Sequence, residues 1–235
     1  MKYLAIGNNA KTIKSDLGGE YLTAIMYMLP NLEVCPMSAL AMCDVACLNT
    51  AGRGAFNSVQ TARAKKTDAF LRDPVAFVDQ LKVDIRIAMR KAARLGVKLA
   101  VRLNGTSDIA WENMRGSNGL TLMQEFGNVQ FYDYTKLPNR KVPSNYHLTV
   151  SYSGANRKYA EKSLRTAHNV AVVFRTKESI PEFWNNRRVI DGDRDDLRFL
   201  DPANVIVALY AKGKAKKDTT GFVVDCANNV LASAA

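Results

Sequence analysis

The sequence predicts an α/β fold in which a mainly parallel sheet curls into a partial (β/α) barrel of about six strands. Short apolar runs typical of buried strands return along the chain, and helical segments lie between them. This alternation favours parallel pairing, because each helix returns the chain to the same end of the sheet. The length of 235 residues suits one domain, residues 1–235, since single α/β barrels reach this size.

The predicted strands are short runs of aliphatic and aromatic residues bounded by polar or turn-forming residues. The first, YLTAIMYML, is apolar enough to be buried on both faces. We expect strands at residues 21–29, 97–103, 129–134, 146–152, 170–174, 188–190 and 205–210, with an edge strand at 221–224.

The clearest helix is bounded by Asp73 and Gly96. Asp73 suits the N-cap, Pro74 suits the first helical position, and Gly96 suits the C-terminal stop. Apolar residues recur on one face from Phe77 to Leu95, which predicts a helix packed on the core. Further helices are expected at residues 55–71, 120–126 and 157–168, the first of them basic with its charges facing solvent.

The composition is that of a globular protein with a strong excess of positive charge. Hydrophobic residues make up 47% of the chain, and it has no run of about 18 apolar residues that would span a bilayer. The net charge of +11 favours polyanionic partners, nucleic acid first, although a solvated basic surface explains it equally well. The segment GKAKKDTT, residues 213–220, is predicted to be an exposed basic loop.

The first residues predict a reducing environment. The chain turns polar after Ile6, too soon for the apolar centre of a secretory signal, so we expect cytoplasmic localisation without disulfides. The segment GNNAKTIKSDLGG lacks the Gly-Lys-Ser/Thr ending of a phosphate-binding loop, and we expect it to lie on the surface.

Three of the four cysteines lie in one glycine-ended loop, residues 35–54, directly after the first predicted strand. Cys35, Cys43 and Cys47 follow the pattern C-x7-C-x3-C. Three thiolates on one loop suit a metal centre that leaves one coordination position open for a ligand. We therefore predict these cysteines to be metal ligands.

Polar residues follow nearly every predicted strand. In parallel α/β folds the loops at the carboxyl ends of the strands share one face, where ligands bind. The cysteine loop lies there, as do residues 133–136 and 175–177. The predicted ligand-binding residues on this face are Asn104, Gly105, Thr106, Ser107, Asp108, Ser151, Ser153 and Asp191. Alternatively, Ser107 and Asp108 cap a helical segment starting at Ile109.

The cysteine triad after the first strand and the turn NGTSD after the second resemble the radical S-adenosylmethionine enzymes, and the short uncharacterised bacteriophage proteins that look like shortened members of that group. The resemblance implies that the cysteines hold a [4Fe-4S] cluster whose fourth iron takes the amine and carboxylate of S-adenosylmethionine. The cluster would cleave this cofactor to start radical chemistry. The usual spacing is C-x3-C-x2-C, however, and Ala46 stands where an aromatic residue is common.

The resemblance further implies an electron-donor partner, and the host cytoplasm if a phage encodes the chain. The charge of +11 makes a nucleotide or nucleic acid the expected substrate, and no membrane partner is expected. Tyr134 and Tyr152, each near a strand end, are candidates for base stacking, although aromatic residues in strands usually belong to the core.

Other chemistry fits the same residues. The cysteines could hold zinc with Cys226 or His147 as a fourth ligand, or be small buried hydrophobes without a metal. The chain would then be a non-catalytic or nuclease-like nucleic-acid-binding protein, with phosphate contacts from the basic helix. The acidic segment 191–201 could bind magnesium, or form a turn in which Arg194 and Arg198 neutralise its carboxylates.

Overall fold

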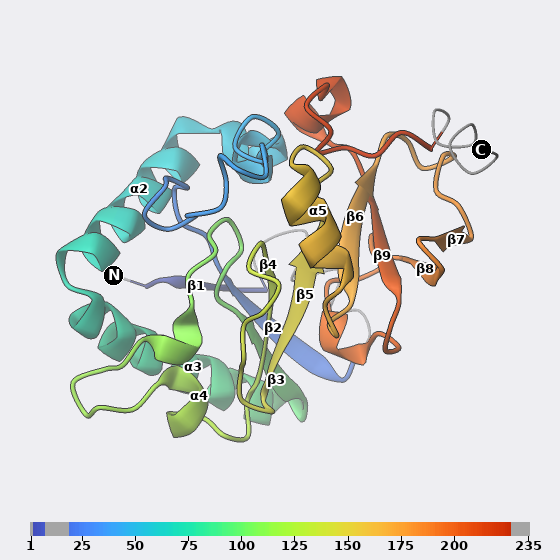
Figure 1. The fold of residues 1–235 in the computed structure, drawn as a ribbon. Coiled ribbons are helices and arrows are strands. Elements are labelled where there is room, and N and C mark those ends of the chain that lie inside the picture. The colour runs from blue at the N-terminus through green and yellow to red at the C-terminus, as the bar shows by residue number, and fades with distance from the viewer. Residues whose placement is uncertain (1, 8–18, 227–235) are drawn as a thin grey trace.

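The computed structural model describes residues 2–7 and 19–226, and its central element is one open sheet (Figure 1). The described residues form nine strands in the order β1-β2-β3-β4-β5-β6-β9-β8-β7. The strands are β1 (Leu4–Ile6), β2 (Tyr21–Met26), β3 (Lys98–Arg102), β4 (Gln130–Thr135), β5 (Tyr146–Ser151), β6 (Val170–Phe174), β7 (Phe183–Trp184), β8 (Arg187–Asp191) and β9 (Ile206–Tyr210).

Most of the sheet is parallel, as predicted. Strands β2 to β6 lie side by side in chain order, β9 follows, and every pair among them is parallel. β8 is also parallel to β9. Among the strands described, the antiparallel pairs are those at the two edges of the sheet, between β1 and β2 and between β7 and β8. Because crossovers between parallel strands are right-handed, a sheet whose strands follow in chain order places its connections on one face.

The sheet does not close, and it has more strands than the expected number of about six. Two strands lie outside every strand range expected from the sequence: β1 and β7 are three and two residues long, too short for an apolar pattern to reveal them. The predicted edge strand at 221–224 is reduced to a single parallel bridge between Phe174 and Val224.

The helices are α2 (Asn57–Arg72), α3 (Pro74–Leu95), α4 (Leu122–Glu125) and α5 (Arg157–Leu164). α3 begins and ends as predicted, because the Asp73 side chain accepts the N–H of Ala76 at 2.9 Å and Gly96 has a φ of 68°. α5 ends at Leu164, earlier than expected. None of the helices described is long and apolar enough to cross a membrane. The polar segment predicted to lie on the surface falls largely outside the described residues.

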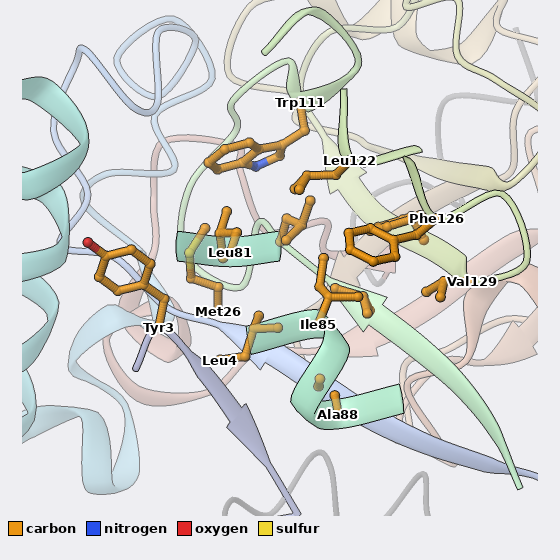
Figure 2. Close-up of a cluster of buried hydrophobic side chains, with 14 of the residues drawn as sticks. Tyr3, Leu4, Met26, Leu81, Ile85, Ala88, Trp111, Leu122, Phe126 and Val129 are labelled. Carbon is orange, nitrogen blue, oxygen red and sulfur yellow. The ribbon is translucent and has the colours of Figure 1, made fainter. Parts of the chain in front are cut away.

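The main core lies between α3 and one face of the sheet (Figure 2). Leu81, Ile85 and Ala88 of α3 are fully buried, which confirms the predicted apolar face except at its end, where Leu95 is exposed. They pack in one cluster with strand residues such as Leu4 and Met26, and with Trp111, Leu122, Phe126 and Val129. Each large side chain buried there stabilises the fold by about 1.5–3 kcal/mol.

The other face of the sheet carries charged and aromatic side chains. Arg102 forms a buried ion pair with Asp196 at 2.9 Å, and the hydroxyl of Tyr132 donates to the same carboxylate at 3.3 Å. Arg198 pairs with Asp195 at 2.9 Å and Asp201 at 3.2 Å. These ion pairs agree with the interpretation that arginines neutralise the carboxylates of the acidic segment 191–201. The segment covers this face of the sheet.

Candidate functional site

A cavity of about 260 Å³ lies at the carboxyl ends of the parallel strands, where the sequence predicts a ligand site. It brings the cysteine loop together with the turns after β3, β4 and β5 and with the chain around β9. The predicted residues that line it are Cys35, Cys43, Cys47, Asn104, Gly105, Thr106, Ser107, Asp108 and Ser151. Lining residues outside the predicted set include Arg102, Tyr134, Lys136, Asp193, Tyr210, Lys212 and Phe222.

All three cysteines of the loop face this cavity as partly buried, free thiols. The Cys35 thiol donates to the carbonyl of Thr106 at 3.6 Å, which joins the loop to the turn after β3. The sulfur of Cys47 accepts the backbone N–H of Asn49 at 3.4 Å. An N–H donor at the sulfur favours the thiolate, the form that ligates metals.

Burial raises the pKa of each of the three thiols, that of Cys35 to about 12. Cys43 and Cys47 are close enough to raise the pKa of Cys35 further, because neighbouring thiolates repel one another. Such thiols stay protonated at neutral pH until a cation displaces the protons. Within the described part of the chain, however, no three His, Cys, Asp or Glu side chains converge closely enough to hold a single metal ion.

The cysteine loop is fastened to α2 through Asn49. Gln60 and Arg63 of α2 both donate to the carbonyl of Asn49, at 3.0 and 2.6 Å, and Asn49 donates its side-chain amide to Gln60 at 3.0 Å. The expectation that the charges of this helix face solvent is therefore wrong for Arg63. It is also wrong for Lys66, which donates to the carbonyl of Tyr3, while Lys65 is exposed.

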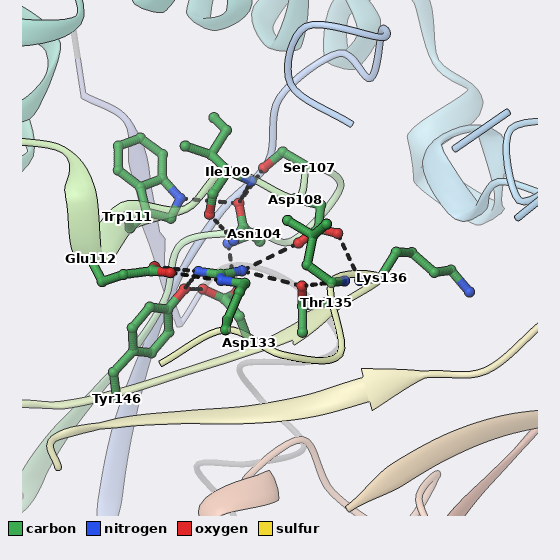
Figure 3. Close-up of polar contacts among 12 residues, drawn as sticks. Asn104, Ser107, Asp108, Ile109, Trp111, Glu112, Asp133, Thr135, Lys136 and Tyr146 are labelled. Carbon is green, nitrogen blue, oxygen red and sulfur yellow. Dashed lines mark hydrogen bonds and ion pairs between the residues drawn. The ribbon is translucent and has the colours of Figure 1, made fainter. Parts of the chain in front are cut away.

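The turn NGTSD directs most of its side chains inward (Figure 3). The side-chain oxygen of Asn104 accepts three hydrogen bonds, from Ser107 Oγ, Ile109 N and Trp111 Nε1, at 2.9–3.0 Å. Thr106 donates to the carbonyl of Met28 at 2.6 Å. A Cβ at Gly105 would lie 2.4 Å from the carbonyl oxygen of Met26, so only glycine fits there.

Asp108 bridges two turns. Its carboxylate accepts the backbone N–H of Lys136 at 2.7 Å and pairs with Arg140 at 3.3 Å (Figure 3). Burial raises the pKa of this carboxyl above its ordinary value despite these partners. The alternative role of Ser107 and Asp108 as helix caps is wrong, because the short 3-10 helix that follows starts at Trp111 and takes no side-chain cap.

The other predicted ligand-binding residues divide between the cavity and its surroundings. Ser151 lines the cavity, whereas Ser153 and Asp191 are not among its lining residues. Ser153 is fully buried and donates to the carbonyl of Ala41 at 2.7 Å, so it holds the cysteine loop against the end of β5. Asp191 is exposed and accepts the N–H of Asp193, which does line the cavity.

The two further zinc ligands considered from the sequence lie outside the cavity lining. Cys226 packs with the cluster around Phe174, and His147 lines a second cavity together with His168.

Tyr152 packs edge-on against Trp184, with ring centroids 5.0 Å apart. Of the two tyrosines considered for stacking, only Tyr134 lines the main cavity.

Lys136 belongs to the segment 133–136 expected on this face, but it is not among the predicted site residues. Its ammonium donates to the carbonyls of Ser151 and Tyr152, at 3.0 and 3.1 Å, and the residue lines the cavity. Its position directly after a buried strand could have indicated this role, because residues at the carboxyl end of a parallel strand border the ligand-binding face. Arg102 gave no such signal, since it lies within β3.

Comparison with known proteins connects this geometry to a family. The family described as Gene product 88 matches residues 3–226, which include the cysteine loop and every strand of the sheet. The chain belongs to the Gene product 88 family. Searches of curated proteins and of solved structures found no match. Gene product 88 is an uncharacterised phage-type family, which agrees with the bacteriophage part of the expected resemblance and says nothing of radical chemistry.

Proposed function

We propose that this member of the Gene product 88 family is an iron–sulfur protein of the radical S-adenosylmethionine type. Cys35, Cys43 and Cys47 would hold a [4Fe-4S] cluster, and the adjoining cavity would take S-adenosylmethionine. A cluster of this kind, once reduced, supplies the electron that cleaves the cofactor and starts radical chemistry. The observation that carries the proposal is the meeting of the three thiols at one cavity at the carboxyl ends of the strands.

The topology supports the proposal. Six parallel strands lie side by side in chain order, from β2 through β6 to β9, and the cysteine loop follows the first of them. This strand order is typical of a sheet whose connections all lie on one face. The sheet would curl as a partial (β/α) barrel around the cavity. Functional loops in such folds gather at the carboxyl ends of the strands.

The donor set suits a cluster better than a single zinc ion. A tetrahedral zinc site needs all its ligands within about 2.0–2.3 Å of one point. Cys226 and His147, the candidates for a fourth zinc ligand, lie outside the cavity lining. A [4Fe-4S] cluster binds each thiolate through a different iron, so it takes thiols that face a common space without converging on one atom.

The chain itself would orient and shield the bound group. The Asn49 N–H would stabilise the thiolate of Cys47, and Gln60 and Arg63 would hold this part of the loop in place from α2. Tyr210, Leu209 and Phe222 give the cavity an apolar wall, which would limit the access of water to a reactive intermediate.

Substrate, partners and location follow from charge and thiol chemistry. Lys214, Lys216 and Lys217 are exposed on the short helix Gly213–Lys217, which packs beside the cysteine loop through Ala215 and Ala46. A nucleotide or nucleic-acid substrate would meet this positive charge near the cavity. Reduction of the cluster would require an electron donor, and four free cysteines suit the reducing cytoplasm of a host cell.

Anaerobic purification with iron, sulfide and zinc analysis tests the proposal. We expect a brown protein with iron and sulfide in equal amounts and broad absorbance near ~400 nm. Separate Cys35→Ser, Cys43→Ser and Cys47→Ser variants should lose the colour, and Cys226→Ser should keep it. A colourless protein, or one zinc per chain lost equally in all four variants, would overturn the proposal in favour of a structural metal or none.

A further inference from the structure

Lys136 is a buried lysine whose side chain faces the cavity. Its backbone N–H is held by Asp108, and its side chain extends away from that polar cluster (Figure 3). The residue is only 8% exposed, yet it is one of those that line the cavity. The ammonium is therefore shielded from bulk water but open to whatever fills the cavity.

The groups in direct contact with this ammonium are uncharged. Two backbone carbonyls, those of Ser151 and Tyr152, accept hydrogen bonds from it. The ring of Phe222 lies 4.8 Å from Nζ and that of Tyr159 lies 5.9 Å away. No carboxylate of the described residues lies within ion-pair distance of Lys136 Nζ, and the carboxylate of Asp108 is engaged by the Lys136 N–H and Arg140.

The other cationic side chains that line the cavity each have a carboxylate partner. Arg102 is paired with Asp196, and Lys212 is paired with Asp193. Lys136 therefore brings into a largely apolar space a positive charge that has no ion-pair partner among the described residues, since Asp108 and Cys43 act on it only from beyond contact distance. Burial of such a charge is unfavourable unless an anion compensates it, and the third N–H of the ammonium remains to bind one.

We infer that Lys136 is the anion-binding residue of the cavity and that the ligand there presents a carboxylate. One unpaired positive charge matches one carboxylate, whereas a phosphate monoester carries about −1.5 to −2 and needs further cations. Burial lowers the pKa of Lys136 to about 8, so most of the side chain is still charged at pH 7. The inference deepens the proposed function, on which it rests for one of its probes.

Calorimetry with matched ligand pairs tests the inference on the anaerobically purified full chain. The first pair is butyrate and butyramide, which have similar shapes and differ in charge. The second is S-adenosylmethionine and its decarboxylated analogue. The variants are Lys136→Met, Lys136→Gln and the control Lys162→Met, which removes an exposed lysine of α5 that is not part of the cavity lining. Circular dichroism verifies folding, and iron analysis of each sample follows the metal separately.

We expect the wild type and Lys162→Met to bind butyrate more tightly than butyramide. Both Lys136 variants should lose this preference by at least about tenfold, the cost of one charge-assisted hydrogen bond. If S-adenosylmethionine shows the same loss and its decarboxylated analogue does not, the carboxylate is that of the cofactor. If the Lys136 variants lose affinity for butyrate but not for S-adenosylmethionine, the carboxylate belongs to a substrate other than the cofactor.

Equal preference for carboxylates in the wild type and in a folded Lys136→Gln would overturn the inference. So would loss of iron from the Lys136 variants without any carboxylate preference in the wild type, since the counter-charge would then be the metal centre. Absence of iron in the wild type would contradict the proposed function, yet the butyrate pair would still decide the role of Lys136.

Discussion

The carboxylate of Asp108 accepts the backbone N–H of Lys136 at 2.7 Å, which joins the turn after β3 to the turn after β4. The same carboxylate pairs with Arg140 at 3.3 Å. Two strand ends that border the cavity are thus fixed relative to each other by one buried side chain. Asp108 is consequently a structural residue of the site, whatever ligand the site takes.

Asp108→Ala should lower the free energy of unfolding by about 1–3 kcal/mol, because a buried N–H at Lys136 and one interaction of Arg140 would lose their partner. Asp108→Asn should cost less, since its amide oxygen can still accept the N–H. Urea denaturation of both variants measures the difference. An Asp108→Ala protein with wild-type stability and weakened ligand binding would show that this carboxylate serves the ligand instead.

Arg63→Ala should loosen the cysteine loop without unfolding the chain. It removes the guanidinium that donates to Asn49 and lies 5.1 Å from the ring of Tyr27. We expect faster hydrogen exchange over residues 47–56. If the cysteines hold the proposed cluster, iron retention should also weaken by a factor of about 10–100, the usual effect of losing a residue that orients metal ligands. Lys65→Ala, an exposed neighbour on the same helix, is the control. Equal exchange in the two variants would contradict an anchoring role.

Asp133 should make stability depend on pH. The residue is fully buried, and burial raises its pKa to about 7, although Arg102 and the Tyr146 hydroxyl oppose the shift. An unfolded Asp has a pKa of about 3.9, so the folded state holds the proton more tightly. The stability that this proton contributes is fully present below about pH 4 and is lost as pH rises through about 7.

Asp133→Asn removes this titration while its amide oxygen can still accept the N–H of Asn104. We therefore expect the stability of the variant, relative to wild type, to improve steadily between about pH 4 and pH 7. Denaturation midpoints measured across this range check the sign. If the difference in stability between Asp133→Asn and the wild type does not vary with pH over this range, Asp133 stays ionised in the folded protein.

Nucleic-acid binding, if it uses the basic helix Gly213–Lys217, should be sensitive to salt. Replacing Lys214, Lys216 and Lys217 by Ala should weaken binding to a single-stranded oligonucleotide and reduce the slope of log affinity against log salt by about 2, since each phosphate contact in a single strand contributes about 0.7. Fluorescence anisotropy at several salt concentrations measures this slope.

Removal of Arg90, Arg94 and Lys98 is the matched control for net charge. These residues lie at the end of α3 and the start of β3, at the opposite end of the strands from the cavity. Equal losses in the two triple variants would mean that binding follows net charge rather than a surface beside the cavity.

Local sequence patterns were enough to predict the longer strands, the main helix and the cysteine loop. The bounds of α3 could be predicted because Asp73, Pro74 and Gly96 act on the backbone locally. The buried parallel strands could be predicted because each is a continuous apolar run. The three cysteines share one face because they are close in sequence and follow a strand of a parallel sheet.

The contacts of each side chain at the site depend on long-range packing and could not be predicted from the sequence. Asp108 meets Lys136 across 28 residues, and Ser153 meets Ala41 across 112, and no local pattern encodes such pairs. Arg63 follows the same helical periodicity as exposed residues, yet it turns inward because the carbonyl of Asn49 lies beside it. Long-range packing sets which polar groups lose water, and a group that loses water must find a partner in the fold or in a ligand.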